Sequence, residues 1–432
     1  MSKDNNKKAP KIRFPGFTDD WEQRKLGDIS EIKTGPFGST LHADDYVSDG
    51  IPIITTEHFK TGTLPIKKDG LPQVSENDFN RLSAYILNEG DIVFSRVGSV
   101  DINALITPFQ NNWLFSGRVL RVRPQGENSS QFLHTLLETE SVRSDIRTRA
   151  VGQTMPSINT EILKITPLFL PTSIAEQERL GEYFHNLDHL ITLHQRKLEK
   201  LKEYKKGMLK KMFPKNGEKV PEVRFPGFDG EWEKDNFSEL MSSLQNNTFS
   251  RAELVSEDGF ARNIHYGDIL VKFGEVLDVS KEYLPMIADK KVLTKFNSSF
   301  LRNGDIVIAD TAEDSTVGKC SEIVGIENKN VLAGLHTMPY RPKKKFAPGY
   351  LGYYLNSSSY HDQLRPLMQG IKVTSISKSA IRDTYIVFPK TEAEQQKIGS
   401  FFHNLDHLIA LQQKKIESLK EFKKGCLQQM FV

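Results

Sequence analysis

Apolar residues recur in alternating steps of four and three along two stretches of the chain, one near its middle and one at its carboxyl end. This spacing is the heptad seam of an α-helix that packs against a partner helix. The seam positions are Leu180, Phe184, Leu187, Ile191, Leu198 and Leu201 in the first stretch, and Ile398, Phe402, Leu405, Ile409, Ile416 and Leu419 in the second. The pattern predicts two helices of roughly 40 residues, each about 60 Å long at 1.5 Å per residue.

The two helical stretches are copies of one another. Residues 184–191 return unchanged as residues 402–409, at an offset of 218. Each seam also carries polar residues at matched places, with His194 corresponding to Gln412 and Lys205 corresponding to Lys423. Polar seam residues weaken a coiled coil but fix its register. The sequence therefore favours pairing of the two helices with each other, while packing of each on a local core stays an alternative.

Both helices are expected to begin with a capping box, in which two side chains satisfy free backbone amides of the first turn. Ser173 with Glu176 has the required spacing in the first copy, and Thr391 with Glu394 has it in the second. Pro214 is expected to end the first helix.

The repeat extends well beyond the helices. The segment 13–17, Arg-Phe-Pro-Gly-Phe, returns as 224–228, and residues 87–93 resemble 301–307. The chain is therefore predicted to alternate domain and helix, with a first domain over 1–171, a spacer helix and linker over 172–219, a second domain over 220–389 and a second spacer helix over 390–432. If the helices run antiparallel, the two chain ends come close together.

Within each domain the pattern indicates mixed structure, and the fold class is α+β. Short apolar or alternating runs predict strands at 51–54, 91–95, 119–123, 267–271 and 305–308, and before each long helix, ending at Leu170 and Phe388. Single helices are expected at 131–149 and 350–367.

Charge is unevenly distributed along the chain, although the net charge is only +3. The first helical segment, 172–219, has 11 Lys and Arg against 7 Asp and Glu, whereas residues 18–171 have 15 against 20. Binding of nucleic acid would thus require a local basic face inside each domain. The two cysteines, Cys320 and Cys426, suggest neither a disulfide framework nor a metal knuckle. With no apolar run long enough to span a membrane, the sequence predicts a cytoplasmic protein without membrane contact.

No catalytic signature fits the sequence. The pair Gly318-Lys319 is followed by Cys320, which excludes a P-loop, and the chain has no Pro-Pro dipeptide of the kind found in adenine methyltransferases. His185 and His189 are spaced to share a helix face, but they fall outside the seam, so a solvated face or a subunit contact is favoured over a metal site.

The Arg-Phe-Pro-Gly-Phe segments, the Gly-Asp-Ile-Val turns and the Phe-His-Asn-Leu-Asp-His-Leu-Ile helix motif resemble the specificity subunits of bacterial type I restriction–modification enzymes, over nearly the whole chain. The resemblance implies two pseudo-twofold-related target-recognition domains, separated by two long helices that form an antiparallel coiled coil. Each domain would read one half of a split, asymmetric sequence in double-stranded DNA, and the helices would set the gap. Two methyltransferase subunits and the restriction subunits would be the partners, with S-adenosylmethionine, ATP and Mg on those partners and none on this non-catalytic chain.

A loop at 152–159 in the first domain returns at 370–377 in the second. Given the resemblance, basic and amide side chains near these repeated loops are the expected DNA contacts. They are Arg143, Arg147, Arg149 and Gln153 in the first domain, and Lys343, Lys344, Lys345, Arg365, Gln369 and Lys372 in the second. Two other readings stay open from the sequence. One is a tandem scaffold that holds two protein partners without touching DNA, and the other is an enzyme with an unrecognised site.

Overall fold

The computed structural model describes residues 9–36, 40–215, 217–370 and 372–432, so the polar segment 1–8 and Ile371 of the repeated loop lie outside the described residues. The chain forms two compact units. The first unit runs up to Gln195 and also takes in Lys414–Val432, whereas the second is Arg196–Gln413. Each unit therefore contains one domain together with part of each long helix.

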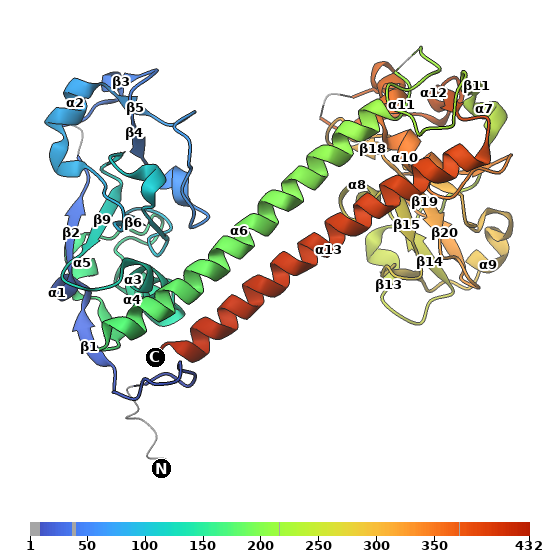
Figure 1. The fold of residues 1–432 in the computed structure, drawn as a ribbon. Helices are drawn as coiled ribbons and strands as arrows, with labels where there is room; N and C mark the ends of the chain where they lie inside the picture. The colour runs from blue at the N-terminus through green and yellow to red at the C-terminus, as the bar shows by residue number, and fades with distance from the viewer. Residues whose placement is uncertain (1–8, 37–39, 216, 371) are drawn as a thin grey trace. The chain divides into compact units, whose positions relative to one another are not determined.

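Both predicted helices form, and both are unbroken (Figure 1). Helix α6 spans Ile174–Lys211 and helix α13 spans Glu392–Met430. Most seam residues are buried, among them Phe184 and Phe402 with no exposed surface. Leu201, Ile409 and Leu419 are half-buried. The heptad pattern thus located the side of each helix that packs inward.

Within each unit the two helices pack antiparallel, because the start of one lies beside the end of the other. In the first unit the Tyr183 hydroxyl lies 3.6 Å from Cys426 Sγ, and in the second the rings of Phe213 and Phe402 stack at 5.8 Å. The predicted meeting of the chain ends is confirmed in the first unit, where the Ile12 N–H donates to the Gln429 carbonyl at 2.9 Å.

A glycine in each helix allows this packing against the domain. A Cβ at Gly181 would lie 2.6 Å from the Phe132 nitrogen, and a Cβ at Gly399 would lie 2.6 Å from the Pro348 carbonyl oxygen. Glycine costs helix stability of about 1 kcal/mol relative to alanine. Its presence at these equivalent positions is explained by the close backbone approach.

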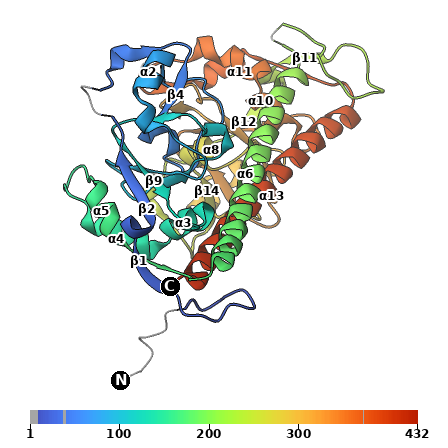
Figure 2. The ribbon, with the colours of Figure 1, turned by 60° about the vertical axis from the view of Figure 1, so that its left-hand side comes forward.

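The first unit contains an antiparallel sheet ordered β2-β9-β6-β7, a second sheet ordered β3-β5-β4-β8, in which only β4 and β8 are parallel, and the pair β1-β10. Helix α5 packs on α1 and β2 (Figures 1 and 2). The strands are β1 Glu22–Lys25, β2 Ser30–Thr34, β3 Tyr46–Val47, β4 Ile51–Ile54, β5 Gln73–Val74, β6 Ile92–Ser95, β7 Asn103–Leu105, β8 Leu114–Phe115, β9 Val119–Pro124 and β10 Pro167–Leu170, and the shorter helices are α1 Leu26–Ile29, α2 Glu76–Arg81, α3 Ser130–Leu137, α4 Glu140–Arg149 and α5 Thr160–Ile165.

The second unit repeats this plan as β12-β21-β17-β19-β15, β13-β16-β14-β20 and β11-β23. It adds β15, which pairs parallel with β19, and the pair β18-β22. Its strands are β11 Glu233–Asn236, β12 Met241–Ser243, β13 Leu254–Val255, β14 Ala261–Ile264, β15 Val276–Asp278, β16 Met286–Ile287, β17 Ile306–Ala309, β18 Thr311–Ala312, β19 Cys320–Val324, β20 Val331–Ala333, β21 Thr337–Pro342, β22 Thr374–Ser375 and β23 Tyr385–Phe388, and its shorter helices are α7 Phe237–Leu240, α8 Tyr266–Val271, α9 Val292–Lys295, α10 Tyr350–Asn356, α11 Ser358–Leu364 and α12 Lys378–Arg382. Each terminal strand pair, β1-β10 or β11-β23, delivers the chain into a long helix.

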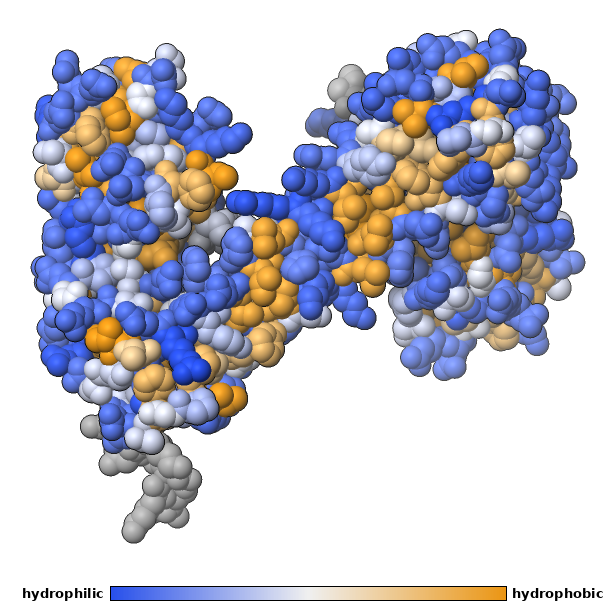
Figure 3. All heavy atoms as spheres, viewed as in Figure 1, coloured by the Kyte–Doolittle hydropathy of each residue, from blue (hydrophilic) through white to orange (hydrophobic). Residues whose placement is uncertain are grey.

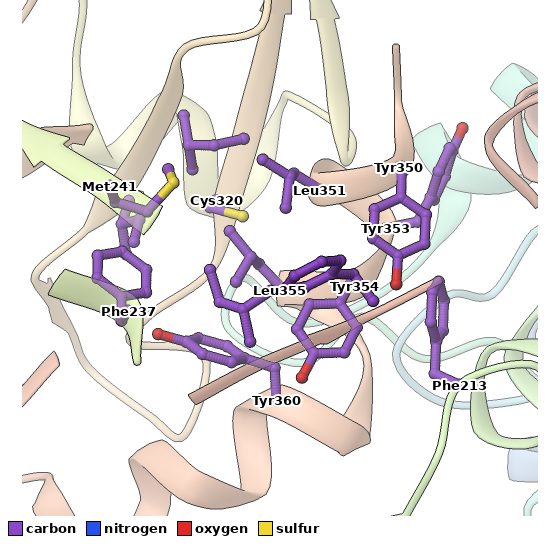
Figure 4. Packing of buried hydrophobic residues seen from close by; sticks show 14 of the residues in the cluster. Phe213, Phe237, Met241, Cys320, Tyr350, Leu351, Tyr353, Tyr354, Leu355 and Tyr360 are labelled. Atoms are coloured by element: carbon purple, nitrogen blue, oxygen red, sulfur yellow. The ribbon is translucent and has the colours of Figure 1, made fainter. Parts of the chain in front are cut away.

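Aromatic side chains close both cores in the same arrangement. In the first unit Phe431 stacks on Phe132 at 5.8 Å and meets Trp21 edge-on at 5.9 Å. In the second unit Phe213 takes the place of Phe431 and contacts Trp232 and Tyr350. Figure 4 shows Phe213 in this core with Tyr350 and Tyr354. Each core is thus completed by a residue that follows a long helix.

The two domain helices predicted as single elements are each interrupted. The predicted helix 131–149 is divided into α3 and α4 at Thr139, and the predicted helix 350–367 is divided into α10 and α11 at Ser357, with a short 3-10 turn at 365–367. The Thr139 hydroxyl donates to the Leu136 carbonyl at 2.7 Å, and the Ser357 hydroxyl donates to the Tyr354 carbonyl at 2.6 Å. A hydroxyl that donates to a helical carbonyl competes with the backbone N–H for that acceptor, and this favours a break in the helix.

The strand predicted at 267–271 is wrong, because these residues belong to helix α8. The His265 ring nitrogen accepts from the Gly267 N–H at 3.2 Å and caps the helix. Ile269 is buried while Val271 is 89% exposed, so the run is not a buried strand. The strands predicted at 51–54, 91–95, 119–123 and 305–308 are confirmed within one residue.

The capping boxes form only in part. The Thr391 hydroxyl accepts from the Glu394 N–H at 3.3 Å as predicted. The glutamate carboxylates bind arginines from the repeated Arg-Phe-Pro-Gly-Phe segments instead of the cap backbone. Arg13 makes two hydrogen bonds to Glu176, at 2.5 and 2.6 Å, and Arg224 makes two to Glu394, at 2.7 and 2.9 Å. These bidentate pairs tie each segment to the start of a helix.

We predict that Phe431→Ala destabilises the first unit by about 3 to 5 kcal/mol, because it removes a buried ring and leaves a cavity. Urea unfolding followed by tryptophan fluorescence measures the loss, since Trp21 contacts the deleted ring. Phe109→Ala is the matched control, because Phe109 is 63% exposed in the same unit. Equal stability of the two variants would show that the first core does not need the chain end.

Candidate nucleic-acid interface

The three arginines expected as DNA contacts in the first unit lie on α4, and all three are in ion pairs. Arg147 binds Asp101 at 2.6 Å and also pairs with Glu140. Arg149 binds both oxygens of Asp145, at 2.7 and 2.8 Å. Arg143 lies 3.7 Å from Glu138, on the side of α4 that faces α3. Arg147 and Arg149 remain 42% and 38% exposed, at the carboxyl end of the helix.

The lysine run 343–345 lies at the far end of β21 from the repeated loop of the second unit. It lines a cleft of about 310 Å³ with Arg302 and Asp305. Lys343 donates to the Ser238 carbonyl at 2.8 Å, Lys344 lies 3.7 Å from the Phe388 ring centre, and Lys345 pairs with Glu392 at 2.6 Å. The structure therefore does not bring this run together with Gln369 and Lys372.

The repeated loops carry the remaining candidates, and these are exposed. Gln153 lies in the loop 151–157, and Lys372 lies in the loop 369–375 with Gln369 at its start. Backbone bridges close both loops, between Val151 and Ser157 and between Gln369 and Ser375. Arg365, 66% exposed and 3.3 Å from Asp362, precedes the second loop.

Equivalent backbone hydrogen bonds hold each loop against the ends of the sheets. The Ile158 N–H donates to the Arg96 carbonyl at 2.9 Å, as the Ile376 N–H donates to the Asp310 carbonyl at 2.9 Å. The Arg96 N–H donates to the Arg118 backbone carbonyl at 3.0 Å, and the Asp310 N–H donates to the His336 backbone carbonyl at 3.1 Å. We define the first loop edge as Thr55, Thr56, Arg96, Arg118 and residues 151–158. We define the second loop edge as His265, Tyr266, Asp310, His336 and the described residues 369, 370 and 372–376.

The first loop edge is basic and hollowed. Thr55, Thr56, Arg96 and Arg118 line a cleft of about 510 Å³. Arg96 is half-buried and donates to the Gly117 carbonyl at 3.2 Å, while Arg118 is exposed. Glu57, also in the lining, pairs with Lys60 at 2.5 Å. The cleft thus presents guanidinium and hydroxyl groups, which are the groups that bind nucleic-acid edges and phosphates.

The second loop edge has a mixed, aromatic character. His336 Nδ1 lies 3.2 Å from Asp310 Oδ1, and its ring meets Tyr266 edge-on at 5.3 Å. Tyr266 also lies against His265, at 4.6 Å between ring centres. Burial, with the nearby Arg251 charge, lowers the pKa of His265 below its usual range. Equivalent positions of the two units therefore offer different chemistry.

The matched seam lysines form equivalent ionic centres where the helices pack. Lys423 binds Asp188 at 2.7 Å and Glu138 at 2.6 Å in the first unit. Lys205 binds Asp406 at 2.6 Å and Glu275 at 2.8 Å in the second. Burial acts to lower the pKa of each lysine, but the paired carboxylates outweigh it and raise the pKa above its ordinary value. Each lysine thus binds one carboxylate of the other long helix and one carboxylate of the domain in the same unit. Such contacts are expected of residues that fix the register of the helices.

The sequence reasoning missed Arg96, Arg118, Asp310 and His336. Their signal was present, because Arg96 and Asp310 directly follow the repeated strands β6 and β17, and Arg118 and His336 directly precede β9 and β21. At such a position the backbone is the same in both copies, but the side chain differs between them.

The two units thus share one design but carry different side chains at equivalent edges, which is typical of a protein that recognises two different targets. A model of the type I restriction modification DNA specificity domain matches residues 18–203 and again residues 230–421. The chain belongs to this family. Specificity subunits recognise DNA and are not themselves the catalysts, in agreement with what the sequence resemblance implied.

Curated relatives span nearly the whole chain. The type I restriction enzyme MjaVIII specificity subunit of Methanocaldococcus jannaschii is 22% identical over 427 residues, which is 98% of this chain and 93% of the relative. The putative MjaX specificity subunit of the same organism is 24% identical over 431 residues, 96% of this chain and 93% of the relative.

Solved structures share the fold. The S subunit of a type I restriction–modification system from M. genitalium matches with a TM-score of 0.57 at 13% identity, over 98% of this chain and 99% of that one. A chain from a study of complex assembly and conformational transition in the type I system matches with a TM-score of 0.54 at 15% identity, over 98% and 99%.

The described residues also bear on membrane and metal binding. None of their helices combines the length and apolar character that crossing a bilayer requires. No three His, Cys, Asp or Glu side chains in this part of the chain gather as metal ligands would. His185 and His189 are exposed on α6, as are His403 and His407 on α13.

We predict that Lys423→Met costs the first unit on the order of 3 kcal/mol, because it leaves two carboxylates close together without a counter-charge. Since the pKa of Lys423 is raised, its contribution is complete below the ordinary lysine pKa of about 10.4 and is lost as pH rises through the higher folded value. Urea unfolding at pH 7 measures the loss. The exposed Lys420 on the same helix provides the control Lys420→Met, and a loss no larger than that control would rule out the register role.

Proposed function

We propose that this chain reads a split DNA site for a type I restriction–modification complex, with the first loop edge on one half-site and the second loop edge on the other. The observation that carries the proposal is the pair of loop edges, in which the same backbone hydrogen bonds hold different side chains. One frame with two sets of side chains suits two unlike half-sites, and hence an asymmetric target.

The long helices are proposed to set the unread gap between the half-sites. Each has one end in each unit and is continuous over 38 or 39 residues, about 57 Å at 1.5 Å per residue. Half-sites read from one face of B-DNA lie about 34 to 36 Å apart, which is within that length. The ionic centres at Lys205 and Lys423 would hold the helices in one register, as a spacer requires.

The residues expected from the sequence are proposed as contacts to the DNA backbone around the loop edges. Gln153, Arg365, Gln369 and Lys372 are exposed in or beside the repeated loops. Arg147 and Arg149 sit at the end of α4, just before the first loop, in ion pairs that are partly exposed. Such pairs contribute about 0 to 1 kcal/mol, so a phosphate can replace the carboxylate at little cost. Arg143 and the lysine run 343–345 lie farther from the loops and are proposed as peripheral contacts.

Two methyltransferase subunits are the proposed partners on the helices, together with restriction subunits. Exposed apolar residues recur at equivalent positions in the two units, and Figure 3 shows apolar patches along the helices. Leu190, Leu193 and Phe422 are 44%, 46% and 53% exposed in the first unit, and Leu408, Leu411 and Tyr204 are 49%, 50% and 51% exposed in the second. Two like apolar faces, one in each unit, fit two copies of one partner. S-adenosylmethionine, ATP and Mg²⁺ would act on these cytoplasmic partners.

We predict that Leu190→Glu with Leu193→Glu removes one methyltransferase subunit from the complex, because charge is introduced into an apolar contact. Native mass spectrometry of the co-expressed complex gives the stoichiometry. Adding Leu408→Glu and Leu411→Glu should remove the second copy. Val271→Glu, at a site 89% exposed in a domain, is the control. Retention of two copies by the quadruple variant would refute docking on these faces.

We predict that the chain, co-expressed with its methyltransferase subunits, directs adenine methylation to a bipartite motif of fixed gap. Sequencing that detects methylated adenines across a test genome measures this. Insertion of one heptad after Gln195 and another after Gln413 adds about 10 Å to each helix. The gap should then widen by about three base pairs, with both half-sites unchanged.

Insertion into one helix alone is the control, because it breaks the register of the Lys205 and Lys423 centres and should abolish methylation. A double insertion that changes the half-sites would contradict the spacer role. Absence of any new methylation from an assembled complex would favour the rival function, a tandem scaffold that does not contact DNA.

A further inference from the structure

Resting on the proposed function, we propose that residues 118 and 336 are the base-reading residues of the two units, with Arg118 selecting a guanine and His336 selecting a base that presents an amino group. The two residues occupy the same place in the frame, since each directly precedes the strand β9 or β21. Each also accepts, through its carbonyl, the backbone hydrogen bond from residue 96 or 310. Both side chains therefore start from a fixed backbone beside a repeated loop.

Arg118 differs from the other arginines of the first domain in its hydrogen bonds and ion pairs within the described residues. Every other arginine between residues 18 and 171 is held by a carboxylate or a backbone carbonyl; these are Arg24, Arg81, Arg96, Arg121, Arg123, Arg143, Arg147 and Arg149. Among the described residues the Arg118 guanidinium has no such partner, and it is exposed in the lining of the 510 Å³ cleft.

The chemistry of a free guanidinium at a rigid edge points to guanine. In the major groove guanine presents two adjacent acceptors, N7 and O6, which match the parallel N–H groups of arginine. Arg96 lies in the same cleft and adds positive charge, while Glu57 in the lining is already paired with Lys60. The cleft therefore attracts an acceptor-rich edge and disfavours bases that offer a donor there.

His336 presents the opposite hydrogen-bonding character. Its Nδ1 faces the Asp310 carboxylate, which accepts only, so Nδ1 carries the proton. Asp310 is itself fixed by the Thr311 hydroxyl, which donates to it at 2.8 Å, and Tyr266 packs edge-on against the imidazole. The other ring nitrogen, Nε2, makes no hydrogen bond within the part of the chain that the structure describes. In the neutral imidazole Nε2 is an acceptor.

An acceptor at this place selects the amino groups of adenine N6 or cytosine N4, which are the donors of the major groove. The backbone of His336 supports a positioning purpose. Its φ of 55° lies in the left-handed region, which non-glycine residues enter at a cost and which is found at sites where a side chain must be aimed. The ring is 47% exposed, so a base edge can reach it.

The test compares the methylated motifs of complexes that contain Arg118→Ala, Arg118→Met or His336→Phe with that of the unaltered complex. Both Arg118 variants should tolerate any base at one guanine of a single half-site, and discrimination there should fall about 10- to 100-fold. His336→Phe keeps a ring against Tyr266 and should relax an adenine or cytosine of the other half-site. The gap and the unaffected half-site stay the same.

Arg302→Ala is the matched control. Arg302 is exposed and has no ion pair among the described residues. It lies in the turn before β17, whereas Asp310 directly follows that strand. This variant should leave both half-sites intact. Thermal unfolding of each purified complex checks that the fold is kept. Because the Arg118 side chain is exposed, its removal leaves no cavity.

Several results would overturn the inference while leaving the proposed function in place. The unaltered complex could methylate a bipartite motif that Arg118→Ala and His336→Phe leave unchanged, or both variants could relax the same half-site. Uniformly weaker binding to all duplexes, with a salt dependence reduced by about one counterion, would make Arg118 a phosphate contact. If the unaltered complex gave no bipartite motif, the proposed function itself would fail.

Discussion

The burial of one aromatic ring at the end of each long helix is the constraint on which both units depend. Phe431 fills the first core among Trp21, Phe132 and Phe184, although it follows a helix that begins in the second unit. Phe213 does the same in the second core after a helix that begins in the first. Burying a phenylalanine side chain contributes about 2 to 3 kcal/mol. Since the helix that delivers this ring begins in the other unit, each core needs both helices.

The ionic centres of the two units neutralise equivalent lysines with carboxylates from different elements of the domains. Lys423 and Lys205 are equivalent, and so are their helix partners Asp188 and Asp406. The second carboxylate is not equivalent. Glu138 follows α3, whereas Glu275 precedes β15. A half-buried lysine needs more than one anion to offset its desolvation, and each domain supplies the second anion from the element that happens to lie nearest.

The sequence predicted best what depends on period and repetition. A 3.5-residue period is specific to paired helices, and Phe184 and Phe402, which follow that period, have no exposed surface. The sequence predictions failed where a single side chain decides the local structure. The hydroxyls of Thr139 and Ser357 interrupt helices that were predicted to be continuous. His265 caps a helix where a strand was expected.

The loop edges could be predicted only in part, for a topological reason. The repeated loops were recognised because their residues are contiguous. Thr55, Arg96 and Arg118 follow or precede three different strands, and only the sheet pairing brings them together. The sequence also could not show that Arg147 and Arg149 of α4 form ion pairs with carboxylates of the same domain.

The sharing of the helices between the units has a consequence for building hybrid proteins. Each half of the chain supplies its own domain, one complete helix and the ring that closes the core of the other unit. A graft cut at the domain borders would therefore place foreign helix ends in both cores. Junctions at mid-helix, after Gln195 and Gln413, would instead transplant each core together with the phenylalanine that completes it and with its own lysine. Only the helix seam residues at the two junctions would then have to be compatible.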